Sequence, residues 1–207
     1  MATIQSGTSP GRRVKVGQLV FGRAASVDTA PVKKPLDALR AVHGSYEKKH
    51  QAAGVAVERL AKAEARVGDL DVTQDASLDV FAAAHIALGA SRMQPLASYK
   101  VGSVSEIKAM ANEKQAKLLL KLAAKGQAHE DIGVKRAAAK MEKAAKAVLA
   151  AIKPMPGLVD KRNEAIAARD ALAPGWEKAF AFLKRAVRVA EDEGASGLFA
   201  ALFEVSE

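Results

Sequence analysis

The sequence predicts an all-α protein, an antiparallel multi-helix bundle of about six to seven helices with an extended N-terminal arm. Alanine, the strongest helix former, supplies 45 of the 207 residues. Apolar residues recur at helical spacing through most of the chain, and no strand-rich segment interrupts them. The connections between helical segments are short, which favours antiparallel neighbours. We therefore expect an extended or flexible arm over residues 1–33 and one helical bundle domain over residues 34–207.

The predicted arm is rich in Gly, Ser, Thr and Arg and shows no helical period. Its few apolar residues alternate as in a strand at 14–16 and form a short run at 19–21 that no local partner covers. Two interpretations remain open, a disordered tail or an arm that becomes ordered on a neighbouring subunit. The second makes the apolar residues of the arm partner-binding: Val14, Val16, Leu19, Val20 and Phe21.

The first long helix is expected at 35–68, where apolar residues recur every seven positions. Gly44 and Gly54 each cost about 1 kcal/mol relative to Ala, so they predict a bend or a close helix crossing. The acidic segment from Asp69 to Asp75 predicts a turn. A second helix then follows at about 76–92.

Capping and breaking residues delimit the remaining helices. Ser103 or Ser105 is expected to cap a third helix that ends at Gly126, a typical residue just past a helix C-terminus. A fourth helix is expected at about 129–152, before the breaker run at 154–157, and a fifth at about 158–172. A sixth begins near Trp176, and a short last helix covers 196–204.

Large side chains are concentrated near the C-terminus. Trp176, Phe180 and Phe182 are expected to pack inside the bundle. The last helix carries four large apolar residues that either close the end of the bundle or dock on another chain. They are Leu198, Phe199, Leu202 and Phe203.

The net charge of +9 is unevenly distributed. Counting side chains gives +5 for residues 1–35, −1 for 36–98, +7 for 99–153 and −2 for 154–207. The basic residues of the third and fourth predicted helices recur every three or four positions, so each set forms a stripe along one helix face. The stripes consist of Lys114, Lys117, Lys121 and Lys125, and of Arg136, Lys140, Lys143 and Lys146.

Three interpretations of these basic stripes remain open. They keep Ala-rich helices in solution, they bind an acidic protein partner, or they contact nucleic acid through its phosphates. The acidic segment at 69–79 makes a second copy of this chain one such acidic partner. Lys outnumbers Arg, and neither interleaved aromatic residues nor a zinc-finger pattern is present, which argues against a reader of base sequence.

The chain offers little catalytic or metal-binding chemistry. His43, Glu47 and His50 share one helix face, and the Glu-x-x-His spacing is that of di-iron bundle proteins. Such a ferritin-like site needs a second pair, but no other His has a Glu three residues before it, so we expect no metal and no cofactor. A literal G-x-S-x-G at 7–11 lacks the strand and helix that a nucleophile elbow requires.

Composition bounds the remaining function classes. The absence of Cys excludes disulfides and thiolate metal sites. No apolar run approaches the roughly 18 residues of a membrane span, and no signal-peptide core is present, so we expect a cytoplasmic protein. No small-molecule substrate is indicated. We expect a non-enzymatic structural or interaction protein, a subunit of a larger, homomeric assembly, with a nucleic-acid-associated protein and a metal-binding ferritin-like bundle as alternatives.

Overall fold

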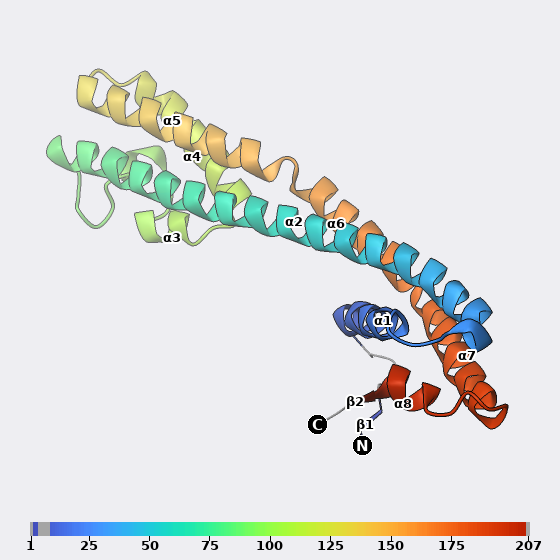
Figure 1. Cartoon of the computed structure of the whole chain (residues 1–207). Coiled ribbons are helices and arrows are strands. Elements are labelled where there is room, and N and C mark those ends of the chain that lie inside the picture. The colour runs from blue at the N-terminus through green and yellow to red at the C-terminus, as the bar shows by residue number, and fades with distance from the viewer. Residues whose placement is uncertain (1, 4–8, 206–207) are drawn as a thin grey trace. The chain divides into compact units, whose positions relative to one another are not determined.

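The computed structural model describes residues 2–3 and 9–205 (Figure 1). The all-α, multi-helix prediction is confirmed: eight α-helices make up most of the described chain. The chain divides into two compact units, unit 1 with Met1–Val57 and Asp160–Glu207, and unit 2 with Glu58–Val159. This division does not follow the predicted boundary at residue 33.

The α-helices are α1 (Pro10–Ala24), α2 (Lys33–Ala87), α3 (Val104–Lys108), α4 (Asn112–Gln127), α5 (Ile132–Ile152), α6 (Met155–Asp170), α7 (Ala173–Asp192) and α8 (Leu198–Phe203). Two short 3-10 helices are present, η1 (Ala30–Val32) and η2 (Ala97–Tyr99). A strand pair joins β1 (Ala2–Thr3) to β2 (Glu204–Val205) in antiparallel register.

Helix α1 corrects the prediction of an extended arm. Ser9 caps it by accepting a hydrogen bond from the Arg12 N–H at 3.4 Å, and Pro10 occupies the first turn. Val16, Val20 and Ala24, at i, i+4 and i+8, form its buried face. Three glycines weaken the helical propensity of this segment, but burial of that face against the rest of unit 1 stabilises the helix. Residues 1 and 4–8 lie outside the described part of the chain, and with them Gly7 and Thr8 of the G-x-S-x-G match.

The core of unit 1 joins the two ends of the sequence. Side chains of α1, η1 and the first turns of α2 pack against one face of α7 and against α8. Trp176, Tyr46, Phe180 and Phe203 are its largest fully buried members, and the Trp176 and Phe180 rings stack at 5.1 Å. The predicted packing role of Trp176 and Phe180 is therefore confirmed.

Helix α2 also corrects the prediction, because no turn interrupts it at Asp69–Asp75. Residues 69–87 contain neither Gly nor Pro, and Leu78 and Phe81 continue a buried face into unit 2. The Thr73 hydroxyl donates to the Asp69 carbonyl at 3.1 Å, so polar side chains here support the helix. Of the bend or close helix crossing predicted at Gly44 and Gly54, the crossing is not found: among the described residues, nothing lies within 4 Å of a Cβ placed at either position.

Unit 2 is built on the α4 and α5 hairpin, whose helices lie side by side and pack with the second half of α2 (Figure 1). The predicted third helix is divided into α3 and α4. Ser103 caps α3 in a capping box with Glu106, as expected from the sequence. Gly126 does not end α4 as predicted; it lies inside the helix, where a Cβ would approach Phe81 Cε2 to 2.6 Å. The absence of a Cβ at Gly126 therefore leaves room for the Phe81 ring to pack against α4.

Within the described residues, no helix is both long and apolar enough to cross a membrane.

Candidate functional site

A groove of about 920 Å³ lies in unit 1, where η1 and the start of α2 face α7. Its lining is largely apolar and includes Pro31, Pro35, Phe182, Ala186 and Val189. Phe182 is 50% exposed and Val189 is 54% exposed. Neighbouring large apolar side chains that remain this exposed within one concave surface are typical of a binding site for another molecule.

The rim of this groove is cationic. Lys33, Lys34 and Arg185 line it, against the single carboxylate of Glu193. Lys33 forms an ion pair with Asp37 at 2.7 Å, and that hydrogen bond lowers the pKa of Asp37. Within residues 2–3 and 9–205, neither Lys34 nor Arg185 has an ion-pair partner. The groove therefore combines an apolar floor with two cations, Lys34 and Arg185, that no ion pair of the described residues compensates.

The prediction that Phe182 packs inside the bundle with Trp176 and Phe180 is wrong, and for that reason the groove was not predicted from the sequence. Residues two apart on a helix do not share a face, so the burial of Phe180 directs Phe182 away from the core. Phe182, Ala186 and Val189 lie at i, i+4 and i+7, a second apolar stripe on α7. This spacing could have been recognised in the sequence.

The cationic character continues along α7 beyond the groove. Arg185 also lines a smaller depression, of about 350 Å³, with Lys184 and Arg188. The Lys184 ammonium lies 5.5 Å from the Phe203 ring centre, and the Arg188 guanidinium lies 4.9 Å from that of Phe199. Burial, and then the charge of Arg188, lower the pKa of Lys184. Aromatic rings of α8 thus hold cations on this side of α7.

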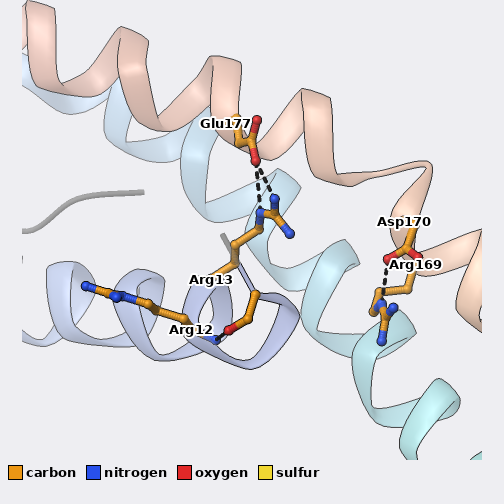
Figure 2. Close-up of polar contacts among 6 residues, drawn as sticks. Arg12, Arg13, Arg169, Asp170 and Glu177 are labelled. Carbon is orange, nitrogen blue, oxygen red and sulfur yellow. Dashed lines mark hydrogen bonds and ion pairs between the residues drawn. The ribbon is translucent and has the colours of Figure 1, made fainter. Parts of the chain in front are cut away.

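A second polar cluster joins α1 to α7. Figure 2 shows Arg13 of α1 reaching Glu177 of α7, with an Nε–Oε1 distance of 3.1 Å. Burial lowers the pKa of Arg13, but its contacts with Glu177 and the Tyr46 oxygen outweigh this and leave that pKa raised. The buried Tyr46 hydroxyl lies near the guanidinium but makes no hydrogen bond of standard geometry with any residue that the structure describes. In the same view Arg169 pairs with its neighbour Asp170 at 2.8 Å. The Arg13–Glu177 contact joins α1 to α7, whereas Arg169 and Asp170 are neighbours at the end of α6.

His43 is buried in the core of unit 1. Its Nδ1 accepts the Trp176 indole N–H at 3.1 Å, and its ring meets Phe21 edge-on at 5.1 Å. The Glu47 carboxylate lies 3.9 Å from Nε2. Burial lowers the pKa of His43, and the charge of Glu47 raises it by less. The ring is therefore held neutral, as an acceptor for Trp176.

A second buried histidine, His85, lies in unit 2. Its Nε2 is 3.0 Å from the Tyr99 hydroxyl, and its ring packs edge-on against His129 at 5.6 Å. His129 Nδ1 accepts the Asp131 backbone N–H at 3.0 Å. Burial and then His129 lower the pKa of His85, while Asp131 raises it. These bonds connect η2 and the start of α5 to the end of α2.

Neither histidine cluster is arranged as a metal centre. Over the described ranges, no three His, Asp or Glu side chains are placed to hold a metal ion. His43, Glu47 and His50 share a helix face as predicted, but His43 directs a ring nitrogen to Trp176.

The structure places all eight stripe residues on the surface of unit 2, on the sides of α4 and α5 away from their buried faces. Lys117 pairs with Glu113, and Lys146 with Glu142, along the same helices.

The apolar residues predicted to bind a partner are mostly covered within unit 1, which corrects the expectation that no local partner covers the arm. Val14 and Phe21 are partly buried, and only Leu19, at 44%, is exposed. In α8, Leu198, Leu202 and Phe203 are buried in the core and Phe199 is partly buried. Val16 and Val20 of α1 are buried in the same core. Arg23 of α1 also donates to the Glu204 carbonyl at 2.7 Å, which ties α1 to β2.

Comparison with known proteins gives no relative: no family model matches the chain, and searches of curated proteins and of solved structures find no significant match. The function must therefore be inferred from the surfaces described above.

Proposed function

We propose that this chain is a non-enzymatic subunit of a homomeric assembly, and that the groove of unit 1 is one half of the contact between copies. A single observation carries the proposal, the half-exposed Phe182 and Val189 on the floor of a groove with a cationic rim. Burying such side chains on a partner stabilises association by roughly 25 cal/mol per Å² of apolar surface. The cations favour a partner that carries acids.

The non-enzymatic part of the proposal is supported by how the buried histidines are used. His43 Nδ1 accepts the indole N–H of Trp176, and His85 Nε2 lies 3.0 Å from the Tyr99 hydroxyl. Each histidine therefore uses a ring nitrogen in a hydrogen bond that stabilises the fold. Neither side chain lines the groove. A cytoplasmic location is part of the same proposal.

Light scattering coupled to size-exclusion chromatography tests the proposal. We expect the molar mass of the wild-type chain to rise with concentration and to fall as salt increases from about 0.05 M to about 0.5 M, because charges at the rim are screened. The double variant Phe182→Ser, Arg185→Glu should elute at the mass of one chain with an unchanged circular dichroism spectrum. Ile132→Ser, Lys178→Glu is the matched control, with an exposed apolar residue and an exposed cation outside the groove. A wild-type chain that stays monomeric at every concentration would refute the proposal.

The exposed basic stripes support a second candidate function, contact with nucleic acid or another polyanion. All eight side chains are exposed, and only Lys117 and Lys146 are paired among the described residues. Duplex DNA binding measured at low and high salt tests it.

A further inference from the structure

We infer that the groove of unit 1 receives the acidic outer face of α2, residues 69–83, from a second copy of this chain. This inference rests on the proposed function and names the partner of the same site.

The outer face of α2 in unit 2 is apolar in the middle. Val72, Ala76 and Val80 follow one another at i, i+4 and i+8, so they lie in one row along the helix. Val72 is 72% exposed and Val80 is 48% exposed. The core of unit 2 uses the opposite side of the helix, with Leu78 and Phe81 buried, so the row is uncovered in its own unit.

Acids border this row. Asp69 and Asp79 are exposed on the same side of the helix, and residues 67–91 contain four Asp and neither Lys nor Arg. Lys108 of unit 2 pairs with Asp79 at 2.7 Å, and Asp75 accepts a hydrogen bond from Gln115. Asp69 has no ion-pair partner over residues 2–3 and 9–205. The face therefore offers an apolar row with net negative charge.

The groove and the face match in both respects. The groove has an apolar floor and two cations without an ion-pair partner among the described residues, Lys34 and Arg185, and the face has an apolar row with acids at its edges. An amphipathic helix that lays residues at i, i+4 and i+8 into an apolar groove is a common mode of protein recognition. Two grooves facing each other would bring their cations together, which like-charge repulsion disfavours.

The contact joins two different surfaces, and each copy carries one of each. Such a heterologous contact builds a ring where the rotation closes and an open filament where it does not. This predicts masses above that of a dimer at high concentration. It also predicts that a copy lacking one surface can still bind through the other.

The test uses two variants of the full chain and their mixture, followed by light scattering. The groove variant is Phe182→Ser, Arg185→Glu, and the face variant is Val72→Asn, Val80→Asn. Val55→Asn, Val57→Asn is the matched control, because these valines are 48% and 45% exposed on the same helix but outside residues 69–83. We expect each of the first two variants to be monomeric, the control to assemble as the wild type does, and an equimolar mixture of the two variants to give a complex of two chains.

Other outcomes are decisive. If the groove variant is monomeric and the face variant assembles normally, the proposed function stands and this inference is wrong, because another surface fills the groove. A mixture that remains monomeric also overturns the inference, because it shows that the groove and the face are not partners. A monomeric wild type rejects both.

Discussion

Gly17 of α1 lies directly against His43 of α2, so that a Cβ atom at residue 17 would fall 2.1 Å from the imidazole Nδ1. The same nitrogen accepts the N–H of Trp176 at 3.1 Å. Three helices therefore meet at one buried ring. Because Gly17 has no Cβ atom, α1 can lie this close to His43 of α2.

We expect Gly17→Ala to lower the free energy of unfolding of unit 1 by about 1–3 kcal/mol, the usual cost of overpacking. Gly22→Ala in the same helix is the matched control, because nothing lies within 4 Å of a Cβ at that residue. It should stabilise α1 by up to about 1 kcal/mol. Urea unfolding followed by the fluorescence of Trp176, the one tryptophan in the sequence, measures both. Equal midpoints for the two variants would contradict the contact.

The lowered pKa of His43 predicts a pH dependence for unit 1. Burial, partly opposed by Glu47, places the folded-state pKa below the ordinary value of 6.5, so the unfolded chain binds the proton more readily. The free energy of unfolding should be greatest above pH 6.5 and should fall progressively as the pH drops from 6.5 toward the folded-state pKa of His43. Protonation also removes the acceptor of the Trp176 N–H.

Urea midpoints read by Trp176 fluorescence from about pH 7.5 to about pH 5 test this dependence. His43→Gln, whose amide oxygen can accept the indole N–H, should show a shallower decline than the wild type. His50→Gln, on the same helix, should not. Parallel curves for wild type and His43→Gln would show that the ring does not titrate as expected.

The all-α class and most helices could be predicted from the sequence, because alanine content, helical spacing and breakers act locally. Helix α1 was missed although its signals were present, with Ser9 and Pro10 at its start and Val16, Val20 and Ala24 at i, i+4 and i+8. Its glycines weaken the local preference, and the burial that compensates comes from α2, α7 and α8, which are distant in sequence. The interval between α3 and α4 has neither Gly nor Pro, so no local signal marked it.

The site was less predictable than the fold for a related reason. Helical spacing separates Phe182 from Phe180, but only the tertiary structure brings η1 beside α7 to form the groove. The charge of the acidic segment was visible in the sequence. Its assignment to a turn, however, concealed that Val72 and Val80 share a helix face.

In unit 2, Gly126→Ala is expected to destabilise the α4 and α5 hairpin by about 1–3 kcal/mol. A Cβ there would lie 2.6 Å from Phe81 Cε2 and 2.8 Å from the Ala138 Cβ. Gly68→Ala on α2 is the control, since its surroundings are open. Thermal unfolding by circular dichroism should give a lower midpoint for the first variant only; a higher midpoint for Gly126→Ala would show that Gly126 is not needed for packing.

The continuity of α2 can be tested at Ala76, an exposed residue beside the acidic segment. Proline inside a helix removes a backbone hydrogen bond and clashes with the preceding turn, so Ala76→Pro should cost about 3 kcal/mol or more. Ala76→Gly should cost about 1 kcal/mol. Circular dichroism with urea would measure both. A proline variant as stable as the glycine variant would restore the predicted turn.

The basic stripe of α4 is expected to be independent of the contact between copies, since it belongs neither to the groove nor to the outer face of α2. Replacing Lys114, Lys117, Lys121 and Lys125 with Gln removes four exposed charges. Light scattering should give the wild-type mass. Any binding to duplex DNA should weaken, and its dependence on salt should become shallower, because up to four phosphate contacts are lost.

Lys48→Gln, Lys49→Gln, two exposed lysines of α2 outside the stripe, controls for the general loss of positive charge. DNA affinity that falls equally in both variants would mean that the stripe has no specific role. If the stripe variant is monomeric while the groove variant Phe182→Ser, Arg185→Glu still assembles, the acids of a second copy bind α4 instead of α7. In that case the stripe, and not the groove, would be the basic half of the contact.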